Sequence, residues 1–170
     1  MKVSCFSPVI DENCTVLILG SIPSVKSREN NFYYSNPQNR FWKILSAITG
    51  TDLKAISNEE KRKELLHLNI ALYDVFSSCE INGSLDGNIK KAEFNDIPSL
   101  IKNTRIKTIY ITSKKAYLCF LRRFGEYFES VGIKIVSLPS TSGANRREYK
   151  TDAELLSEWK KLFSVTELSN

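Results

Sequence analysis

The sequence predicts an α/β fold: a short, mainly parallel, four-stranded sheet with helices on both faces. Short apolar runs rich in β-branched residues alternate along the chain with longer segments of helical periodicity. Such alternation is typical of parallel strands whose crossover helices cover both sides of a sheet. No repeat, linker or low-complexity tract interrupts the 170 residues, so we expect a single domain over residues 1–170.

Local patterns place the individual elements. We expect strands at residues 15–19, 69–75, 106–111 and 133–137, and helices at residues 39–49, 58–67, 97–103, 113–124 and 151–163. Ser113 is a good N-cap residue for the fourth helix. Thr151 and Glu154 have the spacing of a capping box, which marks the start of the last helix.

The segment at residues 77–96 carries turn signals rather than apolar periodicity. Asn82-Gly83 and Asp86-Gly87 are dipeptides that favour turns. We therefore expect an exposed loop over this segment, beside the carboxyl ends of the strands.

Composition limits the classes of binding partner and the cellular compartment that we expect for this protein. Lys and Arg number 24 against 19 Asp and Glu, and this net charge of +5 permits a polyanionic partner without requiring one. No leader-like apolar run follows Met1 and no apolar stretch is long enough to span a membrane, so we expect a cytoplasmic protein. We also expect it to be a monomer. The four cysteines include no close-spaced pair, so we expect neither a metal nor an iron–sulfur site. The sole histidine, His67, ends a charged helix and is not a candidate for acid–base catalysis.

Two polar segments follow predicted strands and are expected to form the two lips of one cleft. The first runs from residues 20–24 through the aromatic residues 32–34 to residues 36–42, and the second spans residues 138–147. In open α/β sheets, ligands bind beyond the carboxyl ends of the strands. The first lip offers aromatic faces and amides, and the second offers two arginines. This mixture suits a flipped nucleobase held between a stacking ring and hydrogen-bonding groups.

Each segment also has a plain structural interpretation. Residues 20–24 fit a tight strand exit, and they lack the pattern of a phosphate loop or a nucleophile elbow. The aromatic residues around Trp42 fit a core cluster, although the neighbouring asparagines need hydrogen-bonding partners. Residues 143–147 fit a solvated loop as well as a phosphate-binding one.

Four stretches, in their order and spacing, resemble the uracil-DNA glycosylase superfamily and most closely its hypoxanthine-DNA glycosylase branch. They are residues 17–27, 32–42, 71–75 and 138–142. The resemblance implies a three-layer α/β/α sandwich. It also implies hydrolysis of the N-glycosidic bond to a deaminated base in DNA, with hypoxanthine preferred and uracil possible, without a metal or cofactor. A mismatch-type uracil-DNA glycosylase and a noncatalytic nucleic-acid-binding module are the alternatives.

The resemblance assigns roles to individual residues. It implies that Asn39 is catalytic and that Phe41 stacks on the flipped base. Asn39 could orient water or hold the base, and Asp74 could accept from a base N–H, activate water or serve as a structural carboxylate. The other base-binding candidates are Gly20, Ser21, Ile22, Pro23, Tyr34 and Ser140. The DNA-binding candidates, with the second lip expected in the minor groove, are Ser24, Lys26, Arg40, Ser142, Gly143, Ala144, Asn145, Arg146 and Arg147.

Overall fold

A four-stranded parallel sheet forms the centre of the structure, a computed structural model that describes residues 1–82 and 86–169. Its strands, in the spatial order β3-β2-β6-β7, are β2 (Val16–Gly20), β3 (Ile70–Asp74), β6 (Thr108–Ile111) and β7 (Lys134–Ser137). Leu17 pairs with Ala71 on one side and with Ile109 on the other, so the neighbouring strands are in parallel register. The predicted sheet is confirmed, and each strand lies within or one residue beyond its predicted range.

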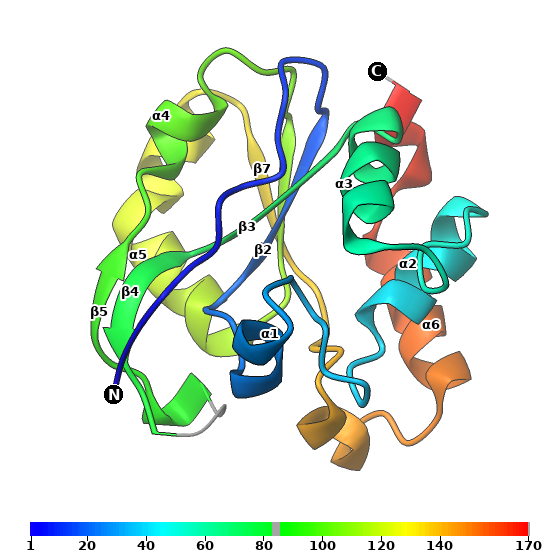
Figure 1. The fold of residues 1–170 in the computed structure, drawn as a ribbon. Helices are drawn as coiled ribbons and strands as arrows, with labels where there is room; N and C mark the ends of the chain where they lie inside the picture. The colour runs from blue at the N-terminus through cyan, green and yellow to red at the C-terminus, as the bar shows by residue number, and fades with distance from the viewer. Residues whose placement is uncertain (83–85, 170) are drawn as a thin grey trace.

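Helices cover both faces of this sheet (Figure 1). One face carries α4 (Ile97–Ile101) and α5 (Lys114–Ser130), and the other carries α2 (Phe41–Thr49), α3 (Asn58–His67) and α6 (Asp152–Leu162). This arrangement is the expected three-layer sandwich. The short helix α1 (Val25–Glu29), which the sequence analysis did not predict, follows β2 at the carboxyl edge of the sheet.

The alternation of side chains along β2 divides the core into two halves. Leu17 and Leu19 pack in the half that contains Phe120 of α5, whereas Val16 and Ile18 pack in the half that contains α2 and α6. All four β2 side chains are completely buried. Burying one such side chain stabilises the fold by roughly 1.5–3 kcal/mol, so β2 is fixed from both sides. The carboxyl end of β2 is therefore a rigid place from which to present a site.

A small antiparallel sheet corrects the prediction for residues 77–96. It has the order β1-β4-β5 and is formed by β1 (Lys2–Ser4), β4 (Phe76–Glu80) and β5 (Lys90–Phe94). The 3₁₀-helix η1 (Asp86–Asn88) lies between β4 and β5, and Gly83 of the expected turn falls outside the described residues. The exposed-loop prediction is thus wrong for both strands. No side chain of β5 is fully buried, so its sequence carries little apolar signal, and β4 pairs with a strand more than seventy residues away.

Helix ends follow their capping residues. Thr151 and Glu154 form the predicted capping box of α6, and Ser113 caps α5 as expected. Helix α5 continues past its predicted end because Phe128 is buried and stacks on Phe120, with ring centroids 5.6 Å apart.

The 3₁₀-helices η2 (Gly143–Arg147) and η3 (Val165–Ser169) are the remaining elements of the chain. Within the described residues, no helix is long and apolar enough to cross a lipid bilayer.

Candidate active site

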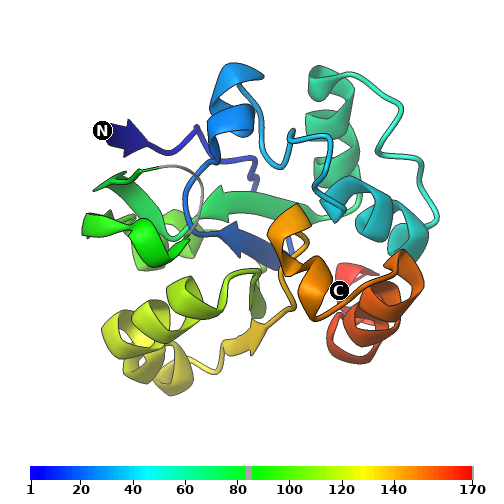
Figure 2. The same cartoon turned by 90° about the horizontal axis from the view of Figure 1, so that it is seen from below.

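The carboxyl ends of the parallel strands meet at one edge of the molecule, at the bottom of Figure 1 and facing the viewer in Figure 2. The chain leaves β2 toward α2 and α3 on one face of the sheet, and it leaves β6 toward α5 on the other face. The two connections diverge, which opens a crevice between neighbouring strands. A cavity of about 280 Å³ lies there, close to the lower end of the usual range for ligand pockets.

Most of the predicted base-binding and catalytic residues come together in this cavity. The predicted residues that line it are Gly20, Ser21, Ile22, Pro23, Ser24, Tyr34, Asn39, Asp74, Ser140, Ser142, Ala144 and Asn145. Three further lining residues, Ser27, Tyr33 and Thr141, lie within the segments that the sequence analysis singled out but were not named as site candidates, and Thr112 and Ser113 lie outside those segments. Residues 112 and 113 directly follow a predicted strand, so the rule that selected residues 20–24 would also have found them.

Gly20 forms the floor of the cavity at the last position of β2. A Cβ atom at this position would lie 2.6 Å from Asp74 Oδ1 and 3.1 Å from Tyr34 Oη. Real Cβ atoms do not approach other atoms so closely, so only glycine lets the Asp74 carboxylate and the Tyr34 hydroxyl converge here. Asp74 is itself buried, at the end of β3, directly opposite Gly20 in the strand register.

The side-chain amide of Asn39 is held in one orientation. Its Oδ1 accepts a hydrogen bond from the Phe41 backbone N–H at 2.9 Å and another from the Thr141 hydroxyl at 2.7 Å. A backbone N–H can only donate, so the atom that receives it is the amide oxygen. The Asn39 NH₂ group is then the part of the amide that is left for the cavity.

An asparagine turn places Asn39 at this point. Asn36 accepts from the Gln38 N–H through its side chain and from the Asn39 N–H through its carbonyl, at 3.0 and 2.8 Å. This local hydrogen bonding is typical of asparagine at turns. The chain then enters α2, whose residues Phe41 and Trp42 are anchored in the core.

Tyr34, rather than Phe41, supplies the ring that faces the cavity. Phe41 has no exposed surface, and the Tyr34 ring is stacked on it, with centroids 3.8 Å apart and planes 11° apart. The expectation that Phe41 contacts a base is therefore wrong, because Tyr34 covers it. Tyr34 has φ = +51°, an uncommon conformation for a side chain of this size. Its Oη atom is 2.8 Å from Thr112 Oγ1, which ties the ring to the end of β6.

The second lip presents small and basic residues around η2. Ser142 accepts from the Ala144 N–H, and Asn145 Nδ2 donates to Ser140 O at 2.9 Å, so these side chains shape the loop. Gly143 does not line the cavity and instead packs on Gln38, where the two lips touch.

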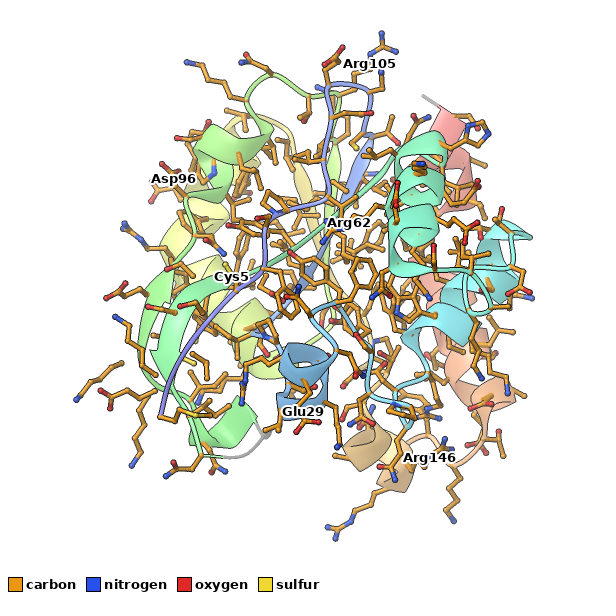
Figure 3. The ribbon with its side chains drawn as sticks, viewed as in Figure 1. Cys5, Glu29, Arg62, Asp96, Arg105 and Arg146 are labelled. Atoms are coloured by element: carbon orange, nitrogen blue, oxygen red, sulfur yellow. The ribbon has the colours of Figure 1, made fainter. Side chains whose placement is uncertain are left out.

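Exposed side chains surround the cavity mouth. Ala144, Arg146 and Arg147 are exposed, and Arg146 projects from the end of the molecule opposite Arg105 (Figure 3). On the first lip, Ser24 caps α1, and exposed Lys26 forms an ion pair with Glu29 at 2.9 Å.

Arg40 is a structural residue, and the prediction that it binds DNA is wrong. Its side chain is only 3% exposed, and Nη1 donates to Tyr149 O at 2.9 Å and to Thr151 O at 3.4 Å. The Asp152 carboxylate lies 3.9 Å away. Burial, with repulsion from Arg146, lowers the pKa of the Arg40 guanidinium. Arg40 thus joins the start of α2 to the segment that precedes α6.

The cavity offers hydrogen-bonding groups and one ring face. Among the described residues that line it, Asp74 is the one carboxylate and no lysine or histidine is present. Across residues 1–82 and 86–169, no three His, Cys, Asp or Glu side chains are grouped so that they could hold a metal ion. The arrangement can bind a flat heterocycle and position a water beside a carboxylate.

Comparisons with known proteins agree with this geometry. Residues 7–163 match the family model described as the uracil DNA glycosylase superfamily. A protein of Methanosarcina acetivorans named hypoxanthine DNA glycosylase is 38% identical over 162 residues, which cover 93% of this chain and 96% of that one. A protein of the same name from Methanosarcina barkeri is 37% identical, over 89% of this chain and 93% of its own length. The solution structure of a putative uracil DNA glycosylase from Methanosarcina acetivorans, 34% identical, matches all of this chain and all of its own with a TM-score of 0.81.

The buried position of Arg40 predicts an effect on stability. We expect Arg40→Met to lower the free energy of unfolding by about 2–4 kcal/mol, because two backbone carbonyls and a carboxylate lose a buried partner. Urea denaturation measures the change. Lys43→Met is the matched control, since Lys43 contacts the same Asp152 carboxylate at 2.6 Å from an exposed position, where an ion pair is worth about 0–1 kcal/mol. Equal stability of the two variants would contradict the structural role of Arg40.

Proposed function

Because the chain belongs to the uracil DNA glycosylase superfamily, we propose that it is a monofunctional DNA glycosylase that excises deaminated bases, hypoxanthine above all. The names of the two Methanosarcina relatives support the choice of base. The single observation that carries the proposal is the cavity at the carboxyl end of β2, where the Tyr34 ring and the oriented Asn39 amide line the same space. Uracil is the second candidate base, in keeping with the family and with the printed title of the similar solution structure.

The orientation of Asn39 supports selection for deaminated bases. Deamination replaces an exocyclic amine, which donates hydrogen bonds, with a carbonyl, which accepts them. Hypoxanthine presents O6 and N7 as acceptors where adenine presents an amine beside N7. An NH₂ group fixed toward the cavity can donate to that carbonyl, whereas it would face the amine of adenine as donor against donor. A site built to hydrogen-bond one partner rejects a mismatched analogue strongly.

The same donor favours the departure of the base. Cleavage of the N-glycosidic bond leaves positive charge on the sugar and develops negative charge on the leaving base. The Asn39 NH₂ group would stabilise that charge through an interaction that strengthens in the transition state. Asp74, at the cavity floor, would orient the attacking water and stabilise the cationic sugar. As the water oxygen bonds to the anomeric carbon in place of the base nitrogen, the water proton would pass to the Asp74 carboxylate and then to the released base anion.

The surroundings of the cavity fit a DNA substrate. A flipped nucleotide would place its base against Tyr34, while η2, with Ala144 at its tip, enters the minor groove. Arg146, Arg147 and Lys26 are exposed at the cavity mouth, where they would contact phosphates. We further propose that the protein acts as a monomer, because a single chain supplies both lips of the cleft. We also propose that it acts in the cytoplasm.

Excision from defined oligonucleotides tests the proposed function. We expect the protein to release hypoxanthine from DNA faster than uracil and to leave adenine in place, and we expect strand breaks to appear only after alkali treatment. Borohydride should trap no covalent adduct, because no described residue lining the cavity is a lysine that could form a Schiff base. Failure to release either deaminated base would refute the proposal, and a preference for uracil would select the second candidate.

Asn39→Asp distinguishes a donor to the base from an acceptor that activates water. The introduced carboxylate would keep an oxygen for the Phe41 and Thr141 donors but would turn a second acceptor toward the cavity. We expect single-turnover excision of hypoxanthine to fall roughly a hundredfold or more in both Asn39→Asp and Asn39→Ala, in line with the loss of one preorganised donor. Melting temperature should stay near the wild-type value in Asn39→Asp, which keeps the acceptor oxygen, and should fall in Asn39→Ala, which leaves the Phe41 N–H and the Thr141 hydroxyl without that acceptor. An Asn39→Asp enzyme that retained substantial activity would assign Asn39 to the water instead.

Tyr34 variants test which aromatic ring stacks on the base. Tyr34→Ala should slow hypoxanthine excision by the equivalent of roughly 1–3 kcal/mol, the usual value of base–aromatic stacking. Tyr34→Phe keeps the ring and removes the hydroxyl with its contact to Thr112, so we expect a much smaller change. Both rates are measured in single turnover at a temperature where each variant is folded. Equal activity of the alanine and phenylalanine variants would show that Tyr34 does not stack on the base.

Arg146→Ala tests the phosphate contact of the second lip. We expect weaker binding to every DNA sequence and a salt slope that falls by about one, as for the loss of one phosphate contact. Arg122→Ala is the matched control, because Arg122 is equally exposed but lies on α5, away from the cavity lining. Fluorescence anisotropy at several salt concentrations measures both slopes. Identical slopes for the two variants would remove Arg146 from the DNA interface.

A further inference from the structure

Thr141 is a buried polar residue that contacts both the candidate catalytic asparagine and the residue after it. Its side chain is 1% exposed, yet it lies in the loop that follows β7. The hydroxyl donates to Asn39 Oδ1 at 2.7 Å, and the backbone carbonyl accepts from the Arg40 N–H at 2.9 Å. A single residue of the second lip is therefore bonded to two consecutive residues of the first.

The direction of the hydroxyl bond is fixed by its neighbours. Asn39 Oδ1 already receives the Phe41 N–H, so it is an oxygen and can only accept. The Thr141 hydroxyl must then donate its proton to Asn39. Two donors on one amide oxygen hold the plane of the amide, and they draw electron density toward the oxygen, which strengthens the NH₂ group as a donor.

We propose that Thr141 is a positioning residue that sets the Asn39 NH₂ group as the donor to the leaving base; this inference rests on the proposed function. The Phe41 N–H is one donor to Asn39 Oδ1 and the Thr141 hydroxyl is a second, so rotation of the amide about χ2 would break two hydrogen bonds rather than one. Thr141 lines the cavity, and its hydroxyl is bonded to Asn39, so its role is to hold the Asn39 amide.

The contribution of the hydroxyl can be separated from the closure of the two lips. The bond from the Arg40 N–H to the Thr141 carbonyl uses backbone atoms only, so it survives any change of the Thr141 side chain. Thr141→Val keeps the shape and removes the hydroxyl, whereas Thr141→Ser keeps the hydroxyl and removes a methyl group. The pair therefore distinguishes the hydrogen bond from packing.

Single-turnover excision of hypoxanthine in a double-mutant cycle tests the proposal. We expect Thr141→Val to lose roughly tenfold to a hundredfold in rate, as when a partner that orients an essential group is removed, with little change in DNA affinity. Thr141→Ser should stay within about threefold of wild type. In the Asn39→Ala background, Thr141→Val should cost almost nothing, because the group that it orients is gone. Should the valine variant not fold, Thr141→Ala replaces it in the same cycle.

Three kinetic results would overturn the proposal: a valine variant as fast as wild type, a serine variant as slow as the valine variant, or rate losses that add in the double variant. A readout without activity separates this proposal from the proposed function. The side-chain NH₂ resonances of Asn39, identified by their loss in Asn39→Ala, should shift in Thr141→Val and not in Thr141→Ser. Unchanged resonances in Thr141→Val would refute the positioning role even if the wild-type protein excised no base.

Discussion

Two loops that leave the sheet at different strands meet over the cavity, and several of their buried polar groups bond to one another. The Arg40 N–H and the Thr141 carbonyl are paired, the Thr141 hydroxyl reaches Asn39, and the Arg40 guanidinium holds the carbonyls of Tyr149 and Thr151. Buried backbone and side-chain polar groups are costly when left without partners, so neither loop can move away independently. The shape of the cavity therefore depends on this reciprocal bonding.

The central sheet holds the ends of the two loops so that they can contact each other over the cavity. Residues 16–19 are buried on both faces, so the end of β2 is held firmly, and Gly20 then allows Asp74 and Tyr34 to approach the same point. The positive φ of Tyr34 is a local cost that is offset by stacking on Phe41 and by the contact to Thr112. The packed end of β2 and the strained Tyr34 ring leave the cavity between them little freedom to rearrange. Preorganised hydrogen bonding requires such a fixed geometry.

The elements that could be predicted from sequence are those whose signals are local. Apolar β-branched runs predicted the four parallel strands, and the Thr151–Glu154 capping box predicted the start of α6. The strands β4 and β5 were missed because polar and charged residues form them and their pairing is non-local. The roles of Phe41 and Arg40 were misassigned for a related reason. The sequence shows that aromatic and basic residues lie near a cleft, but only the packed structure shows that Tyr34 covers Phe41 and that the Arg40 side chain is buried.

The proposed site divides recognition between two kinds of group. Exposed arginines on the second lip act at the phosphates, which are the same beside every base, so they supply affinity without choosing a base. The Asn39 amide acts at a feature that deamination changes, the exchange of an exocyclic amine for a carbonyl. Its selectivity depends on which end of the amide faces the cavity, and a free amide could present either end. The buried donors from Phe41 and Thr141 remove that ambiguity, so hydrogen bonds that never touch the substrate decide what the site can recognise.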